Sequence, residues 1–146
     1  LVGSGPEEAR YKAWVERHNL TQKVTWTGML PHAEVIKLFG VAHIFLFPSV
    51  TDTQGIVLAE ALAAGAPVVA ANKMGPTAII EDEKNGFLVP PRAKPFIDRV
   101  ETLLDNEVLW HTLSAAARVR AQDFSIERTS ARLEEIYVDV RNRYRA

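Results

Sequence analysis

The sequence predicts an α/β fold in which a Rossmann-like parallel sheet is sandwiched by helices and followed by a helical tail. Short apolar runs alternate with helical segments over the first two thirds of the chain, and the last third reads as helix. The runs are continuously apolar rather than alternating, which is typical of parallel strands buried on both faces. With 146 residues, 47% of them apolar, the chain fits one domain with its own core. We therefore expect residues 1–146 to form a single domain.

The first half begins with a glycine-rich turn, in which Pro6 suits the first position of a helix and Glu7 suits its positive end. Too few residues precede this turn for the strand it should follow, so we expect the amino end to be cut. Gly40 closes one later helix, and Pro48 stops one buried strand. The expected elements are a helix over 6–18, a strand over 23–28, a helix over 31–40 and a strand over 43–49.

The second half opens with an apolar helix over 55–64, which Gly65 closes and Pro67 prevents from continuing. Asn85 and Gly86 form a turn further along. The remaining expected elements are strands over 67–71 and 87–90, a short helix over 77–81, and tail helices over 92–105, 107–121 and 125–144.

The composition argues against several classes of partner. The 17 basic and 18 acidic residues nearly cancel, so no nucleic acid partner is expected. The chain has no cysteine, which excludes disulfides and thiolate metal sites and fits a cytoplasmic protein. The longest apolar run contains Glu60, Gly65 and Pro67, so we expect at most peripheral membrane contact, for instance at the inner face. The four histidines lack metal-ligand spacing, and we expect no metal site.

The loop 48–54 and the helix start after it are the part of the sequence with the clearest potential to bind a ligand. Ligands of open parallel sheets lie beyond the carboxyl ends of the strands, where this loop is expected. Gly55 allows a ligand to approach the backbone, and the free N–H groups of Gly55, Ile56 and Val57 at a helix start favour an anion. Two acids, Asp52 and Glu60, would bracket that anion and accept hydrogen bonds from hydroxyl groups. This order of groups matches a nucleoside diphosphate sugar.

A purely structural interpretation of the same residues stays open at this point. Asp52 can cap the helix start, with Thr51 or Thr53 as alternative caps, and Glu60 can be a solvent-facing position.

The stretch "FLFPSVTDTQGIVLAEALAAGAPVVAA" resembles the signature of retaining GT-B glycosyltransferases of family 4, the "group 1" type. Their hallmark is Glu-x7-Glu, a helix, a turn ending in proline and a Val-Val strand. Here the pair is Asp52-x7-Glu60, so the first acid is shortened. The resemblance continues through "VGSGPE", "VTWTGMLPHAEVIKLF" and "NGFLVPP", and so covers nearly the whole chain.

The resemblance implies a role for each matching residue. The family's second acid, here Glu60, holds the ribose, and the first, here Asp52, approaches the donor hexose. The donor is a UDP or GDP sugar, no cofactor is involved, and no metal is demanded. The other positions implied to lie around the nucleotide and its diphosphate are Gly3, Ser4, Leu30, Thr53, Gln54, Gly55, Ile56 and Val57.

Two parts of the family pattern are missing from the sequence. The basic pair that grips the diphosphate lies upstream of the "GSGP" turn, and an amino-terminal domain binds the acceptor, a glycan or a lipid. We therefore expect the carboxyl-terminal, donor-binding half of a glycosyltransferase, inactive by itself. The alternatives are a non-catalytic Rossmann-like binding domain and a nucleotide-sugar epimerase on the same fold.

Overall fold

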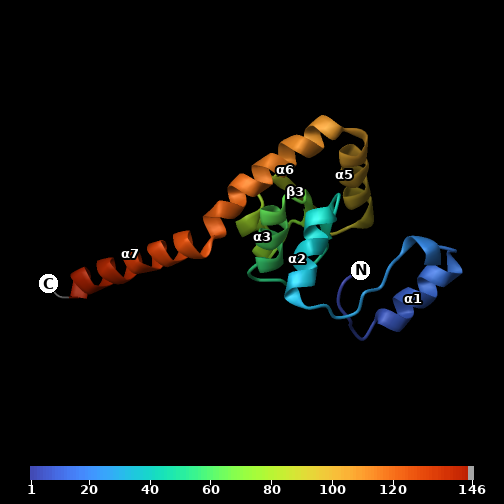
Figure 1. Cartoon of the computed structure of the whole chain (residues 1–146), viewed down its shortest axis with the longest axis horizontal. Coiled ribbons are helices and arrows are strands. Elements are labelled where there is room, and N and C mark those ends of the chain that lie inside the picture. The colour runs from blue at the N-terminus through green and yellow to red at the C-terminus, as the bar shows by residue number, and fades with distance from the viewer. Residues whose placement is uncertain (145–146) are drawn as a thin grey trace. The chain divides into compact units, whose positions relative to one another are not determined.

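A computed structural model of the chain describes residues 1–144. The chain divides into two compact units, one from Leu1 to Leu38 and one from Phe39 onward. Each unit is described by itself below, and Figure 1 gives the order of the elements along the chain.

The first unit holds helix α1 (Glu8–Arg17), the 3-10 turn η1 (Thr21–Lys23) and most of helix α2 (His32–Val41), which continues through Gly40. The strand expected over 23–28 is absent from this unit, and Gly3 and Gly28 form only an isolated antiparallel bridge. The N–H of Gly3 donates to the carbonyl of Gly28 at 2.8 Å, and that of Thr27 donates to Leu1 at 3.1 Å. The extended segment meets only the first three residues, too few for a continuous ladder.

The second unit is built on a parallel sheet in the order β1 (Phe45–Phe47), β2 (Val68–Ala71) and β3 (Gly86–Val89). Val69 of β2 stands opposite Leu46 on one side and Phe87 on the other. Every residue of β2 is buried. Successive side chains of a strand point to opposite faces, so both faces of the sheet are covered. The expected parallel sheet sandwiched by helices is confirmed.

The helices of this unit are α3 (Ile56–Ala64), α4 (Met74–Ile79), α5 (Ala93–Asp105), α6 (Glu107–Ala121) and α7 (Ile126–Tyr144), with the 3-10 turn η2 (Gln122–Phe124) between the last two. All but α4 begin and end within one residue of the expected positions. Helix α4 was expected over 77–81 but begins at Met74, because Pro76 lies in its first turn, where a missing N–H costs no intrahelical bond.

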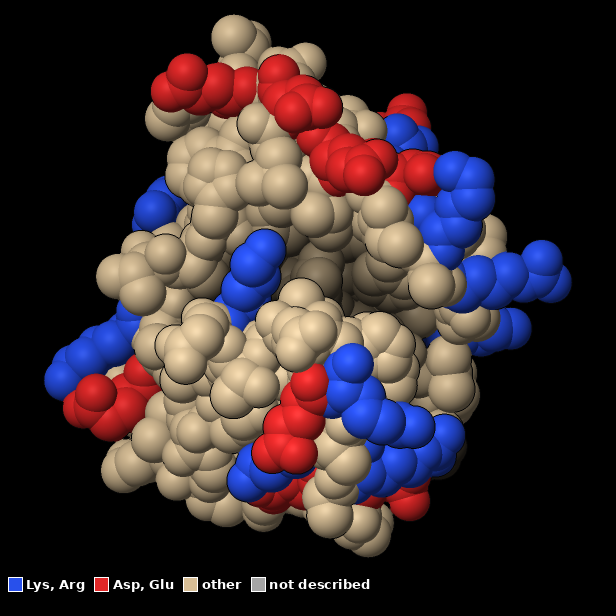
Figure 2. Space-filling view, turned by 90° about the vertical axis from the view of Figure 1, so that its right-hand side faces the viewer, with Lys and Arg blue, Asp and Glu red and all other residues tan. Residues whose placement is uncertain are grey.

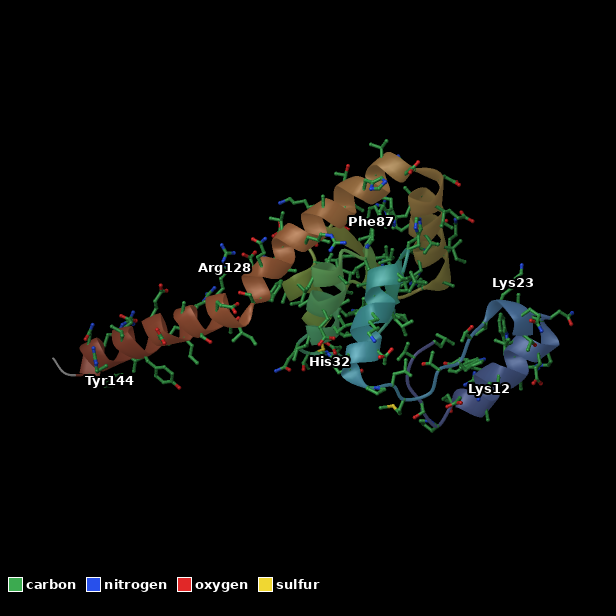
Figure 3. The ribbon with its side chains drawn as sticks, in the orientation of Figure 1. Lys12, Lys23, His32, Phe87, Arg128 and Tyr144 are labelled. Carbon is green, nitrogen blue, oxygen red and sulfur yellow. The ribbon has the colours of Figure 1, made fainter. Side chains whose placement is uncertain are left out.

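One core cluster joins the sheet to α5 and α6 through Val69, Phe87, Val89, Leu103 and Leu113. Figure 3 marks Phe87, which extends from β3 within this unit. Helix α3 contributes the fully buried side chains Leu58 and Leu62. The apolar side chains of α3 therefore serve packing, and a polar residue among them needs a separate explanation.

Two side chains of α6 donate hydrogen bonds to carbonyl groups at the end of α3. Gly65 terminates α3 in the left-handed conformation with φ 81°, and its carbonyl accepts a hydrogen bond of 2.7 Å from the buried Ser114 hydroxyl. Arg118 lies against Gly65 and donates to the carbonyl of Ala63 at 3.4 Å. The last carbonyls of α3 thus meet donors from α6, and a cation lies at the negative end of the helix.

The tail helix α7 is exposed along all of its described length (Figure 1). Arg128 and Tyr144, both labelled in Figure 3, mark its first and last turns. No helix within residues 1–144 is long and apolar enough to cross a membrane. Acidic and basic side chains both occur in small groups on the face drawn in Figure 2, in line with the nearly balanced charge of the chain.

Candidate functional site

The candidate site lies at the carboxyl end of β1, where the chain turns into α3. Gly55 directly precedes the helix and has a φ of 68°, in the left-handed region that glycine adopts without strain. Gly55 is buried, whereas the next residue, Ile56, is 61% exposed. The first turn of α3 is therefore open to solvent on the side that carries Ile56.

Asp52 closes the loop that leads into this helix. Its Oδ1 accepts hydrogen bonds from the N–H of Gln54 at 3.1 Å and from the N–H of Gly55. Its own N–H donates to the Ser49 hydroxyl at 3.3 Å, and its carbonyl accepts from the N–H of Gly75 at 3.0 Å. The carboxylate thus forms an Asx-type turn directly before the helix. It bonds to no N–H group of the helix itself, so it is not the side-chain cap that the sequence allowed; Gly55 is the N-cap residue.

The Asx turn corrects one detail of the sequence prediction. The N–H of Gly55 was expected to be free for an anion, but it donates to Asp52. The N–H groups of Ile56 and Val57 belong to the first helical turn, which has no carbonyl partner within the helix. Of the three N–H groups predicted to face an anion, these two are the ones whose position at the positive end of the helix dipole still fits that prediction.

The second oxygen of Asp52, Oδ2, accepts no hydrogen bond from residues 1–144. Asp52 is half-buried, so part of its surface meets solvent. One carboxylate oxygen therefore organises the loop, and the other can accept a hydrogen bond from a ligand hydroxyl.

Glu60 lies in the second turn of α3 and is half-buried. Residues four apart share a helix face, so Glu60 lies on the same face as Ile56. Both line a hollow of about 700 Å³ between α3, the end of α6 and the start of α7, together with Arg118, Phe124 and Ile126. The helix start and Glu60 therefore open into the same space. At about 1.5 Å per residue, Glu60 lies roughly 7 to 8 Å along the axis from Gly55.

The other predicted residues of this loop are on the surface. Thr53 and Gln54 are exposed, and Gln54 contributes only its backbone N–H to the turn around Asp52. Among residues 1–144, no three or more histidine, aspartate or glutamate side chains are grouped to hold a metal ion. The expectation that no metal is needed stays a prediction.

Residues 1–120 match the protein family described as "Glycosyl transferases group 1". This chain belongs to that family. The alpha-D-kanosaminyltransferase of Streptomyces kanamyceticus is one of its relatives, 29% identical over 142 residues, which cover 96% of this chain and 37% of that enzyme. This chain therefore spans little more than a third of the length of that glycosyltransferase.

Solved structures with the same fold are also known. Sucrose-phosphate synthase from Thermosynechococcus elongatus matches with a TM-score of 0.85 and 28% identity, over 96% of this chain and 37% of that structure. A mutant of TarM from S. aureus, solved with fondaparinux, alpha-GlcNAc-glycerol and UDP, matches with a TM-score of 0.75 and 26% identity, over 86% of this chain and 26% of TarM. The expected fold class, the carboxyl-terminal half of a GT-B glycosyltransferase, is confirmed.

The first unit of this chain of the group 1 family contains the remaining predicted residues. Gly3 and Ser4 line a hollow of about 300 Å³ with Tyr11 and Trp26. The bridge between Gly3 and Gly28 brings the glycine-rich turn to the Gly28–Leu30 turn, and Leu30 is half-buried. The structure thus joins within one unit the two turns that the family resemblance assigns to the nucleotide.

Sequence reasoning missed one residue of the candidate site, Gly75. It is buried against the loop of Asp52, with which it shares a hydrogen bond. A Gly-Pro pair four residues after the end of a buried strand was the available signal, because such a pair marks a place where the backbone comes close to another segment.

Proposed function

We propose that this chain is the donor-binding domain of a retaining glycosyltransferase that moves a hexose from a nucleoside diphosphate to a glycan or lipid acceptor. The single observation that carries the proposal is the pair Asp52 and Glu60 on either side of the open first turn of α3, in a chain of the group 1 family. The domain is one part of a longer enzyme, with the acceptor bound by an amino-terminal domain. The proposal includes the cytoplasmic location that the sequence predicts.

The donor is held by three groups in a row. The N–H groups of Ile56 and Val57 and the dipole of α3 bind the diphosphate. Glu60 accepts hydrogen bonds from the ribose hydroxyls, and Oδ2 of Asp52 accepts one from the hexose. We propose a UDP or GDP sugar as the donor, and the UDP in the complex of the TarM relative supports the uridine form.

The catalytic contribution of this domain is electrostatic. Transfer breaks the bond between the anomeric carbon and the diphosphate oxygen, and negative charge accumulates on the departing diphosphate. Backbone N–H groups fixed at a helix start stabilise that charge without reorganising during the reaction. The oxygen of the acceptor hydroxyl then bonds to the same face of the anomeric carbon, so that its configuration is retained, and the departing diphosphate oxygen takes up the hydroxyl proton.

Calorimetry on the full-length protein tests the proposal. UDP, GDP and their glucose and mannose conjugates are titrated into the wild type and into Glu60→Ala. We expect one base to bind selectively and Glu60→Ala to lose about 1.5 to 3 kcal/mol of affinity, the value of hydrogen bonds to a charged group. Glu101→Ala is the matched control, because Glu101 is an exposed glutamate on α5 outside the site.

Two results would contradict the proposal. Unchanged affinity in Glu60→Ala refutes the ribose assignment. The absence of nucleotide binding in the wild type would favour the non-catalytic binding domain instead.

A further inference from the structure

The loop of Asp52 contacts the first turn of α4, in which Gly75 lies. The N–H of Gly75 donates to the Asp52 carbonyl at 3.0 Å. Gly55 and Gly75 are both buried where these two segments meet. The site at the start of α3 is therefore shaped by two consecutive strand-to-helix connections, the one after β1 and the one after β2.

The two segments are too close for a side chain at position 75. A Cβ atom on Gly75 would lie 2.7 Å from Oδ1 of Asp52 and 2.9 Å from the backbone nitrogens of both Gln54 and Gly55. Real Cβ atoms essentially never come within 3.0 Å of another heavy atom, so one of these groups would have to move. The φ angle of Gly75 is outside the left-handed region, so glycine is needed here for its small volume alone.

The three atoms that a Cβ would strike are the acceptor and the two donors of the Asx turn. Oδ1 of Asp52 accepts from the N–H groups of Gln54 and Gly55, and all three surround the space above Gly75. Because Gly55 is bonded to the Asp52 carboxylate, a displacement of this turn moves both of them. Gly55 directly precedes α3, so the start of the helix moves as well. A methyl group at position 75 thus acts on both the hexose and the diphosphate contacts.

We infer that Gly75 is a positioning residue of the donor site, which holds the carboxylate of Asp52 and the start of α3 in their binding geometry by leaving room for the Asx turn. The inference rests on the proposed donor-binding function for its effect on affinity. The effect on the turn itself can be observed without any ligand.

Two measurements on the full-length protein test the inference, with Gly75→Ala compared against Gly40→Ala. Gly40 is an exposed helical glycine with no atom within 4 Å of its Cβ position and no positive φ, so it is a matched control. The first measurement is the amide ¹H and ¹⁵N shift of Gly55, which reports its hydrogen bond to Asp52. The second is calorimetry with UDP and UDP-glucose.

We expect Gly75→Ala to shift the Gly55 amide resonance and to lower the affinity for both UDP and UDP-glucose about tenfold, which is the scale at which contacting residues couple. Gly40→Ala should change neither the amide shift nor the two affinities. In the Asp52→Ser background, which lacks the oxygen nearest to the added methyl group, Gly75→Ala should reduce the affinity for UDP by a smaller factor than it does in the wild type.

Wild-type affinity and an unmoved Gly55 amide in Gly75→Ala would overturn the inference, as would an equal loss of UDP affinity from Gly75→Ala in the wild type and in Asp52→Ser. A wild type that binds neither UDP nor UDP-glucose refutes the proposed function instead. In that case the Gly55 amide still decides whether Gly75 positions the turn.

Discussion

Replacing Asp52 by alanine removes the acceptor that closes the loop into α3. Two backbone N–H groups, those of Gln54 and Gly55, lose their partner Oδ1. Gly55 is buried, so its N–H is left without a hydrogen bond away from water, which costs about 1 to 3 kcal/mol. The N–H of Gln54 belongs to an exposed residue, and water replaces its partner at little cost. We therefore expect Asp52→Ala to lower the free energy of unfolding by about 2 kcal/mol.

Urea unfolding followed by circular dichroism measures this loss. For a chain of this size, about 2 kcal/mol corresponds to a fall in the melting temperature of roughly 4 to 8 °C. Asp52→Asn keeps an amide oxygen in place of Oδ1 and should lose clearly less stability than Asp52→Ala. Asp105→Ala is the control, since Asp105 is an exposed aspartate at the end of α5 and should change stability by less than about 0.5 kcal/mol.

The same variant separates the two roles of the carboxylate. Asp52→Ala should retain binding to the free nucleoside diphosphate better than binding to the intact sugar donor, because only the hexose contacts Oδ2. The reasoning fails if Asp52→Ala unfolds at the same urea concentration as the wild type, because the hydrogen bonds to Oδ1 would then contribute nothing. Equal losses of affinity for the nucleotide and the sugar donor would show that Asp52 acts only through the loop.

Two further predictions concern α5 and α6. Ser114→Ala removes the buried bond to the Gly65 carbonyl and should cost about 1 kcal/mol in thermal unfolding; an unchanged melting temperature would contradict this. The hydrogen bond to Asp98 and the charge of Asp98 raise the pKa of Lys94 above its ordinary value. The pair therefore stabilises the folded state fully at pH values below the ordinary lysine pKa, and this stabilisation is lost as the pH rises through the raised pKa. In Asp98→Asn, the NMR titration of Lys94 should move to lower pH, and an unmoved titration would contradict the assignment.

The parts of the fold that were predictable from the sequence are those in which one segment carries its own signals. Helix α3 and strand β2 are continuous apolar runs separated by Gly65 and Pro67, and both begin and end within one residue of the predicted positions. The segment 23–28 was predicted as a strand because it has β-forming residues. A strand also needs a second segment to pair with along its length. Residues 23–28 face only the first three residues of the chain, and the sequence of 23–28 itself does not show this.

The structure brings the predicted site residues Asp52, Gly55 and Glu60 to the start of α3 as the sequence suggested, whereas their hydrogen bonding was less predictable; that this is the donor site stays a prediction. The spacing of Asp52 and Glu60 and the glycine before the helix placed the site at the start of α3. The sequence does not show which acceptor the N–H of Gly55 takes, because that depends on the χ angle of Asp52 and on the conformation of the loop. The need for glycine at position 75 depends on the approach of a segment more than twenty residues away along the chain.

Chemical-shift mapping of the full-length, isotope-labelled protein with UDP, GDP and ADP, each beside its glucose or mannose conjugate, tests the donor-binding claim most directly. We predict base-selective binding that shifts the amides of Ile56, Val57 and Glu60, with Asp52 responding further when the sugar is attached. Shifts confined to residues outside the first two turns of α3, or no shifts with any of these ligands, would contradict the assignment of this domain as the donor site.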